Sequence, residues 1–349
     1  MQMQQTAKTG KEQHRTPLET MRFWLINARP VALPQSVMPA VTALLLAAME
    51  PAFSWWLGAL AVLGGCLAHL GMNLADDYFD YKKVQTGFRE SLAREGIRAR
   101  TVKCPYITSG EATLNQTLAA AVVFGILALI PGAVVLWFRG WPVLLIVGIA
   151  VFLGESYSGN PLRLSYRGLG EPDIGVMFGP LLMAGVYVAA CGHLSVRLII
   201  PAVCMGLLVT NVLYVHSVLD IEADRKAQKA TLAVLLKTDR ARLAALAVIL
   251  FVPYALTTAA ALAGLCSIWY LLVLLTLPMA VHLFQSVRQH VKDPGKPVVR
   301  RAIGGPMANW ELICKGGLDW FMYRWYMARN LLTAFALVCC VVSLILALV

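Results

Sequence analysis

The sequence predicts an all-α protein that spans a membrane nine times, and three observations carry this prediction. Hydrophobic residues make up 58% of the 349 residues and charged residues only 14%, which is more apolar surface than a water-soluble chain of this length can bury. Apolar runs recur at lengths near the roughly 20 residues that a helix needs to cross a hydrocarbon core of about 30 Å. Positively charged residues gather in every second connection between these runs.

The elements follow one another without a long break. The first 30 residues are polar and lack a compact apolar stretch with a small-residue cleavage site, so we expect a cytoplasmic segment and no cleaved signal peptide. Residues 31–349 are expected to form a single transmembrane domain. The nine predicted spans are 31–50, 53–75, 113–137, 141–158, 172–192, 196–218, 241–264, 267–287 and 327–349.

The distribution of Lys and Arg predicts the orientation of these spans. With nine spans, 28 of the 30 Lys and Arg fall on the side of the N-terminus, and only Arg139 and Arg197 fall on the other. By the positive-inside rule the N-terminus is cytoplasmic and the C-terminus lies outside, as in a multi-pass protein of the cell (inner) membrane. The cytoplasmic connections 81–112, 219–240 and 288–326 are long and charged, so we expect them to cap the functional site.

Two compositional features exclude other classes of site and partner. The eight Cys show no CxxC spacing, and most lie inside the apolar runs, so we expect reduced, buried thiols. The net charge of +11 follows in part from topology, and the rest suits anionic membrane lipid or a phosphate-bearing substrate. No nucleic-acid partner is expected.

An acidic cluster closes the second apolar run, in the stretch NLADDYFD. Asn73, Asp76, Asp77 and Asp80 occupy positions i, i+3, i+4 and i+7, which share one face of a helix. Such oxygen-rich groups repel one another unless a positive charge lies between them. Carboxylate oxygens suit Mg²⁺, which takes one or two carboxylates and completes its shell with water and phosphate oxygens.

A second acidic cluster follows the sixth run, in the stretch HSVLDIEADRKAQKATL. His216, Asp220 and Asp224 line one helical face, and Glu222 points elsewhere. A lone acid at the end of a span is usually a solvated cap or an ion-pair partner, but intramembrane acids are costly and typically functional. A diphosphate bridged by metal ions needs two carboxylate clusters that face each other. We expect two Mg²⁺ ions there, and Mn²⁺ is an alternative.

Cations occur near the same face. They could hold diphosphate oxygens, and each is equally well explained as a positive-inside anchor. These residues are Lys103, Arg163, Lys226 and Lys229.

Four stretches, in order, resemble motifs of the UbiA-type intramembrane prenyltransferases. NLADDYFDYKK is similar to the first Asp motif, and DIEADRKAQKATLAVLL to the second. YSGNPLRLSYRGLGEPDIGVMFGPLL and FMYRWYMARNLL resemble the segments after span four and before the last span. Within that superfamily the chain looks most like 1,4-dihydroxy-2-naphthoate polyprenyltransferases of menaquinone synthesis.

The resemblance has departures at three positions. Asp76 stands where the family usually has Asn, Gln228 replaces the usual Gly, and no further acid follows Asp80 within a few residues. In the stretch with the GLGE turn, Gly168, Gly170 and Glu171 are expected to shape a turn. Pro172 is expected at the first position of span five.

The resemblance implies a fold and a mechanism. Nine helices would surround a central cavity that binds a polyprenyl diphosphate. Asn73 and Mg²⁺ would hold the diphosphate there. The Mg²⁺ ligands would be Asp77, Asp80, Asp220 and Asp224, with Asp76 behind them. Its tail would lie in an apolar groove open to lipid. The C1–O bond then breaks, and an electron-rich aromatic acceptor such as 1,4-dihydroxy-2-naphthoate attacks, with loss of its carboxylate.

The cation or the acceptor could be flanked by aromatic and polar side chains near the same end. Tyr157, Asn160 and Tyr166 are candidates because aromatic faces stabilise positive charge, although interfacial aromatics at a helix end explain them equally well. His216 could line the cavity with Asp220, or it could form a helix–helix hydrogen bond.

Three alternatives stay open. The acceptor could be a hydroxybenzoate, a homogentisate or a tetrapyrrole, or be absent as in a terpene cyclase. An ion-coupled transporter also carries intramembrane acids, but near the bilayer midplane and beside broken helices, whereas both clusters here end intact apolar runs. CDP-alcohol phosphotransfer is a third possibility, and its motif spacing is not found.

Overall fold

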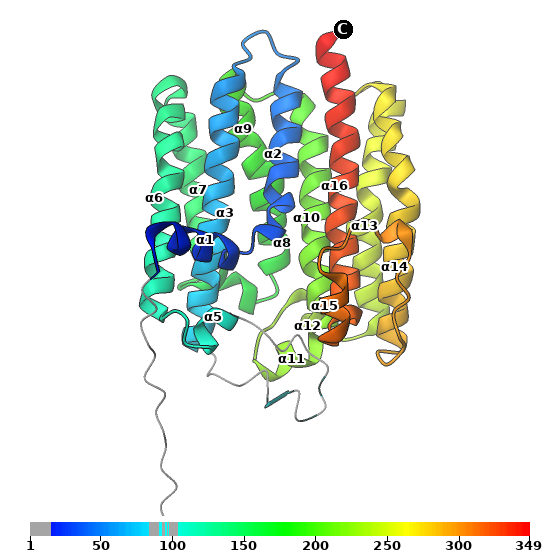
Figure 1. Cartoon of the computed structure of the whole chain (residues 1–349). Coiled ribbons are helices and arrows are strands. Elements are labelled where there is room, and N and C mark those ends of the chain that lie inside the picture. The colour runs from blue at the N-terminus through cyan, green and yellow to red at the C-terminus, as the bar shows by residue number, and fades with distance from the viewer. Residues whose placement is uncertain (1–14, 84–90, 93–94, 96, 98–103) are drawn as a thin grey trace, which may run out of the picture.

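The computed structural model describes residues 15–83, 91–92, 95, 97 and 104–349. In this part of the chain the structure is all-α, as predicted, and the single β-type contact is an isolated parallel bridge between Arg167 and Ala230. The long helices stand side by side, and the C-terminus lies at the end opposite α11, α12 and α15 (Figure 1). We call the end with these short helices the cap end.

The helices alternate long spans with short connecting turns. In order they are α1 (Pro17–Asn27), η1 (Pro30–Ala32), α2 (Pro34–Ala47), α3 (Trp55–Lys83), α5 (Pro105–Thr108), α6 (Leu114–Arg139), α7 (Trp141–Ser158), η2 (Leu164–Tyr166), α8 (Gly170–Val176), η3 (Met177–Leu181), α9 (Leu182–Cys191), η4 (Val196–Leu198), α10 (Ile199–Leu219), α11 (Ile221–Lys226), α12 (Leu232–Leu235), α13 (Asp239–Leu262), η5 (Ile268–Thr276), α14 (Leu277–Lys292), η6 (Ala302–Gly304), α15 (Trp310–Lys315) and α16 (Asp319–Leu348).

Eight helical segments of the described chain are long and apolar enough to cross a membrane, so the protein is an integral, multi-pass membrane protein. The ninth predicted span, 31–50, differs from expectation. Its helix α2 has only 14 residues, or about 21 Å at 1.5 Å per residue. Pro30 and Pro34 lie at the starts of η1 and α2, and because proline has a fixed φ and no N–H, the regular α-helix begins only at Pro34.

The predicted spans also differ from the helices in their ends. Helix α3 continues past residue 75 to Lys83, so the first acidic cluster lies on the helix itself. Helix α8 begins at Gly170, which puts Pro172 at the third helical position and corrects the expected start there. The final span begins at Asp319, eight residues before the predicted start at 327.

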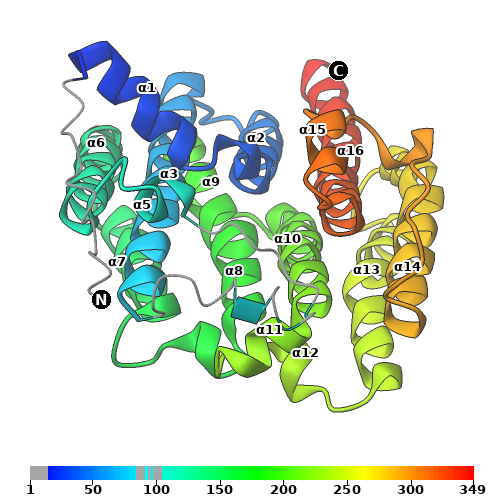
Figure 2. The ribbon, with the colours of Figure 1, turned by 60° about the horizontal axis from the view of Figure 1, so that its bottom comes forward.

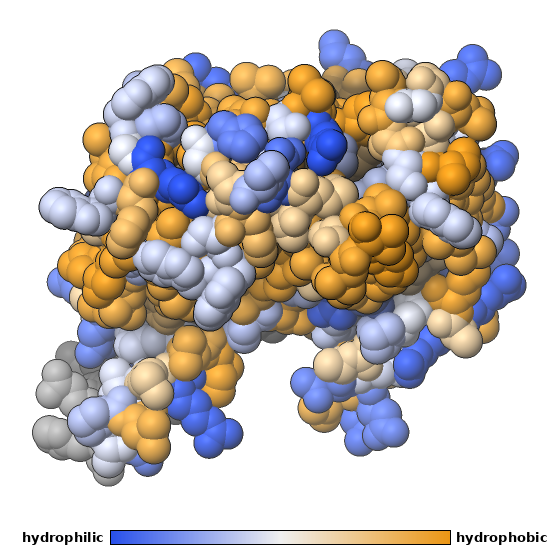
Figure 3. Space-filling view, turned by 90° about the horizontal axis from the view of Figure 1, so that it is seen from above, coloured by the Kyte–Doolittle hydropathy of each residue, from blue (hydrophilic) through white to orange (hydrophobic). Residues whose placement is uncertain are grey.

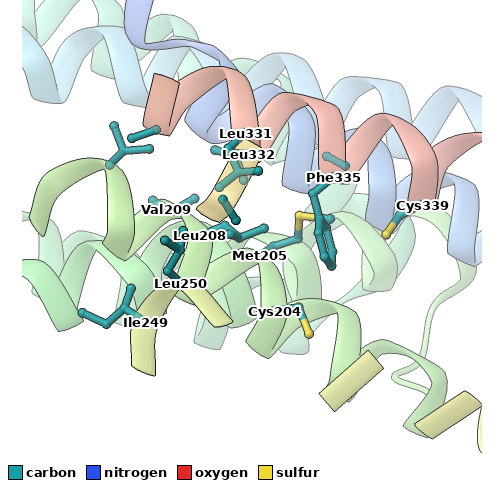
Figure 4. Packing of buried hydrophobic residues seen from close by; sticks show 14 of the residues in the cluster. Cys204, Met205, Leu208, Val209, Ile249, Leu250, Leu331, Leu332, Phe335 and Cys339 are labelled. Atoms are coloured by element: carbon teal, nitrogen blue, oxygen red, sulfur yellow. The ribbon is translucent and has the colours of Figure 1, made fainter. Parts of the chain in front are cut away.

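Helix α10 is the centre of the packing. Its buried residues Cys204, Met205, Leu208 and Val209 face Leu250 of α13 and residues of α16 (Figure 4). The α16 contributors are Leu331, Leu332, Phe335 and Cys339. In the view from the cap end, α8 and α10 lie between α3 on one side and α13 and α14 on the other (Figure 2).

Apolar side chains also cover much of the outside, as lipid requires. Val123, Ile126 and Ile130 of α6 and Leu144 of α7 are each more than half exposed. Seen from the C-terminal end, which is one end of the bundle and not its side, apolar and polar side chains are interspersed (Figure 3). Because lipid is as apolar as these side chains, the helices associate through close packing more than through the hydrophobic effect.

The closest packing joins the span of α8 and α9 to α10 through glycines. A Cβ added at Gly179 would lie 2.4 Å from the Cα of Gly206, and one at Gly175 would lie 2.9 Å from the Gly206 carbonyl oxygen. Gly179 lies in η3, a π-helical turn that contains Pro180. Such turns are frequent at functional sites, and the neighbouring Met177 and Phe178 line the cavity described below.

We predict that Gly179→Val lowers stability by about 1–3 kcal/mol, because the new methyl groups meet backbone that cannot move aside. Thermal unfolding in detergent should show a clear fall in melting temperature. Gly148→Val is the matched control, since a Cβ at Gly148 has no described atom within 4 Å. Equal melting temperatures for the two variants would contradict this account of the packing.

Candidate active site

A cavity of about 260 Å³ lies among α2, α3, α7, α8, α10 and α16. Its lining residues are of two main kinds, and we call the polar set the polar wall and the apolar set the apolar wall. The polar wall consists of Arg29, Asn73, Asp76, Glu155, Tyr157, Ser158, Ser165, Glu171, Asp224, Lys229 and Thr231. The apolar wall consists of Val31, Ala32, Met72, Ala75, Phe79, Ile174, Met177, Phe178, Leu213, Phe321, Met322 and Trp325. Four further polar side chains, Gln35, His69, His216 and Ser217, and the glycines Gly154 and Gly170 complete the lining.

Asp76 and Asn73 are the residues of the first acidic cluster that face this cavity. The Ser158 hydroxyl donates a hydrogen bond to Asp76 Oδ1 at 3.0 Å. The Asn73 side chain donates to the carbonyl of Ala28 at 2.9 Å, which ties α3 to the segment before α2. Asp76 therefore presents carboxylate oxygen to the cavity from a helix that is anchored on both sides.

Asp77 is not among the cavity-lining residues. It is only 3% exposed and meets the Arg29 guanidinium at 3.2 Å and the Tyr106 hydroxyl at 3.1 Å. Burial, reinforced by the Asp77 carboxylate, raises the pKa of Tyr106, so its hydroxyl keeps its proton and donates. Of the four side chains expected to share one helical face, only Asn73 and Asp76 line the cavity.

Arg29 joins the acidic residues of α3 to one another. Besides Asp77 it approaches Asp76 at 3.5 Å and donates to the backbone carbonyl of Asn73 at 2.8 Å. Burial alone would lower the pKa of this guanidinium, but Asp77 and Asp76 raise it. A positive charge therefore lies between the carboxylates, as their mutual repulsion requires.

Asp80 is held by the connection after α7. The Tyr166 hydroxyl donates to Asp80 Oδ1 at 3.0 Å, and burial raises the pKa of Tyr166. Arg163 lies 4.6 Å from the centre of the Tyr166 ring, and Lys229 Nζ lies 5.7 Å from it. Tyr166 thus links a carboxylate of α3 to two of the predicted cations.

The second acidic cluster starts where α10 ends. Asp220, 1% exposed, follows the last residue of α10, and its carboxylate lies 3.3 Å from Nε2 of His216. The Asp224 amide donates to the Asp220 carbonyl at 2.9 Å, so the i, i+4 spacing continues into α11. His216 and Asp224 both line the cavity, and the His216 ring meets the edge of Phe321.

Lys229 completes the polar wall opposite α3. Its amide donates to the Asp224 carbonyl at 2.8 Å. Burial alone would lower the pKa of its ammonium group, but Tyr157, Asp76 and Asp224 raise it, so Lys229 stays charged. The preceding Gln228 has φ of 54°, the left-handed conformation that glycine adopts most easily.

Glu171 fixes the segment that carries Lys229. Its buried carboxylate accepts the Leu232 amide at 3.1 and 3.2 Å, at the free N-terminus of α12. The bridge between Arg167 and Ala230 adds a second tie between the same two connections. Glu171 thus does more than shape a turn before α8.

Several predicted residues do not line the cavity. Lys226 forms an ion pair with Glu95, Arg163 lies over Tyr166, and Asn160 is exposed. Asp80 and Asp220 are also absent from its lining. Lys103 lies outside the described residues.

The structure adds residues that sequence reasoning missed. Arg29 counted only as a cytoplasmic positive charge, and no local pattern links it to Asn73, which lies 44 residues later. Ser165 and Thr231 place buried hydroxyl oxygens, without a hydrogen-bond partner among the described residues, at the polar wall. His69 continues the Asn73 and Asp76 face by one turn and could have been found by extending that stripe backwards.

The polar wall suits a divalent cation that is shared with a ligand. Within the described residues, no three His, Cys, Asp or Glu side chains gather closely enough to hold a metal ion. Asp76 and Asp224 nevertheless line one cavity with carboxylate oxygens, the donor type that Mg²⁺ prefers. These residues fit Mg²⁺ that takes its remaining ligands from water and phosphate oxygens.

Comparisons with known proteins agree with this architecture. The sequence model of the UbiA prenyltransferase family matches residues 36–304. A 1,4-dihydroxy-2-naphthoate octaprenyltransferase of Mycobacterium tuberculosis is 30% identical over 302 residues, which cover 84% of this chain and 96% of that protein. A 2-carboxy-1,4-naphthoquinone phytyltransferase of Synechocystis is 27% identical, with 79% of this chain and 85% of that protein covered.

A solved structure has the same fold. It is a UbiA homologue from Archaeoglobus fulgidus bound to DMAPP and Mg²⁺, and it matches with a TM-score of 0.54 at 14% identity. The match covers 90% of this chain and 98% of that one.

We predict that Arg29→Met destabilises the protein by about 1–3 kcal/mol, because it leaves the buried Asp77 without its charged partner. Thermal unfolding of the single variants and of the double variant with Asp77→Asn measures the coupling. The second substitution should cost less in the Arg29→Met background than in the parent protein. Strictly additive effects would show that the ion pair contributes no stability.

Proposed function

Because the chain belongs to the UbiA prenyltransferase family, we propose that it transfers a polyprenyl group from a prenyl diphosphate to an aromatic acceptor. We propose 1,4-dihydroxy-2-naphthoate, as used in menaquinone synthesis, as that acceptor. The single observation that carries the proposal is the cavity itself, whose lining combines acidic and basic groups with apolar side chains. A diphosphate head and a prenyl tail require both kinds of side chain.

The polar wall is the proposed site of the diphosphate. Asp76 and Asp224 would hold Mg²⁺, and the relative solved with DMAPP and Mg²⁺ supports this cofactor. When bound, Mg²⁺ would neutralise charge on the departing diphosphate. Asp76 stands where the family usually has Asn, and either residue offers an oxygen.

The remaining carboxylates stand behind this pair in the proposal. Asp77, Asp80 and Asp220 are still proposed to contribute negative charge to the metal and diphosphate site. In the structure Asp77 contacts Arg29 and Tyr106, Asp80 contacts Tyr166, and Asp220 contacts His216.

The diphosphate oxygens need donors as well as metal. Lys229 and Arg29 are charged groups on the polar wall, and Asn73 lies beside them. The hydroxyls of Ser165 and Thr231 have no other hydrogen-bond partner among the described residues. Because such fixed donors need no rearrangement as charge develops on the leaving group, they would lower the barrier to C1–O cleavage.

The apolar wall would receive the prenyl chain and the cation formed from it. Phe178, Phe321 and Trp325 offer aromatic faces that stabilise positive charge, and Tyr157 does so from the polar side. Keeping water out of this region prevents conversion of the cation to an alcohol. The tail is proposed to follow the apolar wall towards the surrounding lipid.

The proposed acceptor rests on the relatives. The protein from Mycobacterium tuberculosis is named for 1,4-dihydroxy-2-naphthoate, and the one from Synechocystis for 2-carboxy-1,4-naphthoquinone. Both names describe a naphthalene ring with two oxygens and a carboxyl group. A different aromatic acceptor, or none, is the alternative within the same chemistry.

We predict that membranes containing the protein convert labelled prenyl diphosphate and 1,4-dihydroxy-2-naphthoate to a lipid-soluble product with Mg²⁺ but not with EDTA. Asp224→Asn should lower this activity by about 100-fold or more, because the negative charge that holds the metal is lost and the neutral amide oxygen binds it more weakly. Product extraction and diphosphate release are the two measurements, with hydroxybenzoate and no acceptor run in parallel.

Glu222→Gln is the matched control, since Glu222 lies on the same short helix and is exposed. It should retain the parent activity. Full activity in folded Asp224→Asn protein would refute the diphosphate site. Metal-dependent diphosphate release without a naphthol product would instead refute the acceptor.

We also propose that the cap end is cytoplasmic and that the protein lies in the cell (inner) membrane. Cys314 on α15 is exposed and lies between the last two spans. A membrane-impermeant maleimide should therefore label it in inside-out vesicles but not in right-side-out vesicles. The Cys314→Ser variant identifies the labelled site, and labelling of Cys314 in right-side-out vesicles would reverse the proposed orientation.

A further inference from the structure

We propose that His69 accepts the proton of a ring hydroxyl on the aromatic acceptor, and thereby orients the ring and makes it more nucleophilic. This inference rests on the proposed prenyl transfer and adds to it a residue that acts on the acceptor rather than on the diphosphate. It also implies a phenolic acceptor, because a ring without a hydroxyl group would gain nothing from this contact.

His69 occupies a position where a ring could bind beside the reacting carbon. It lies on α3 one helical turn before Asn73, a rise of about 6 Å, and thus away from the carboxylates of the polar wall. The side chain is 6% exposed and lines the cavity. Its ring packs against Phe178 of the apolar wall, with centroids 4.6 Å apart and planes 53° apart.

Ser36 ties Nδ1 of His69 to α2. The Ser36 hydroxyl lies 3.0 Å from the carbonyl oxygen of Leu33 and 2.9 Å from His69 Nδ1. In the proposed arrangement the hydroxyl donates its hydrogen to Leu33, so that Nδ1 of the neutral ring donates to Ser36 and Nε2 keeps a lone pair.

Nε2 has no hydrogen-bond partner among the described residues. A leucine would fill the same place against Phe178 without bringing a polar atom to the cavity. An imidazole whose one nitrogen is fixed by Ser36 and whose side chain lines the cavity is instead suited to a ligand that donates a hydrogen bond. A phenolic hydroxyl is such a donor.

The chemistry balances without any further reactant. As the C1–O bond of the donor breaks, its electron pair leaves with the diphosphate, and a π pair of the ring forms the new C–C bond. The hydroxyl conjugated with the attacked carbon becomes a carbonyl, and its proton moves to His69 Nε2. When the carboxylate leaves as CO₂, its electron pair restores the ring, and the oxygen takes the proton back from His69.

The first test compares 1,4-dihydroxy-2-naphthoate with its two monomethyl ethers in the unmodified protein. An ether oxygen can accept a hydrogen bond but cannot donate one. At least one ether should react 10-fold or more slowly than the parent acceptor, because a site that hydrogen-bonds a substrate hydroxyl discriminates against an analogue without it. Equal rates for the parent and both ethers would overturn the proposal without any variant.

The second test uses variants of His69. His69→Leu should lower transfer by about 100-fold, the lower end of general-base effects, and should abolish the preference for hydroxyl over ether. Its KM for prenyl diphosphate should stay within about twofold of the parent value, and metal-dependent release of diphosphate should continue, with the alcohol as product. His69→Gln should keep the acceptor KM but not kcat, because an amide oxygen accepts a hydrogen bond without taking the proton.

Two further variants separate this role from a structural one. Ser36→Ala should lower kcat for the acceptor less than His69→Leu does, since only the anchor of Nδ1 is lost. His193→Gln, a histidine outside the cavity, should behave like the parent. If folded His69→Leu or His69→Gln protein keeps the parent rate of transfer and the preference for hydroxyl over ether, the role of His69 is refuted and the prenyl-transfer proposal stands. If the parent protein shows no metal-dependent release of diphosphate, the prenyl-transfer proposal is refuted, and the role of His69 with it.

Discussion

The ion pair of Arg29 with the carboxylates of α3 is the interaction on which the site depends. Four oxygen-rich side chains at the end of a membrane span repel one another and lose hydration when they are buried. Arg29 meets Asp77 and Asp76 and also binds the backbone of α3. Because Arg29 directly precedes η1 and α2, the same contact sets where the first apolar helix joins α3. Arg29 therefore both compensates the charge of the α3 carboxylates and positions the first apolar helix against α3.

The opposite side of the cavity is held by backbone ties between connections that lie far apart in sequence. Glu171 binds the start of α12, and Arg167 pairs with Ala230. These ties bring Asp224, Lys229 and Thr231 to the wall that faces Asp76. The glycine contacts of η3 with α10 then let Met177 and Phe178 line the apolar wall. The proposed cleavage of a C–O bond next to lipid needs both fixed polar groups and apolar side chains that exclude water.

The proposed functions of the two walls meet at α3. Asp76 and Asn73 belong to the part of the helix that would hold the diphosphate, while His69, one turn away, lies among apolar neighbours and would meet the acceptor. A single helical face would thus present a group for the leaving diphosphate and a group for the attacking ring. The spacing of one turn matches the need to keep a charged head and an aromatic ring apart but within reach of the same carbon.

The sequence by itself determined the features that depend on local periodicity. These are the all-α class, eight of the nine predicted spans, and the face shared by Asn73 and Asp76, because helical spacing and span length are set by neighbouring residues. Only the tertiary structure decided which carboxylates line the cavity, that Arg29 pairs with Asp77, that Lys226 pairs with Glu95 and that Ser36 lies beside Nδ1 of His69. Those partners come from segments far apart in the chain, and no local pattern encodes which of several equivalent charges packing brings together.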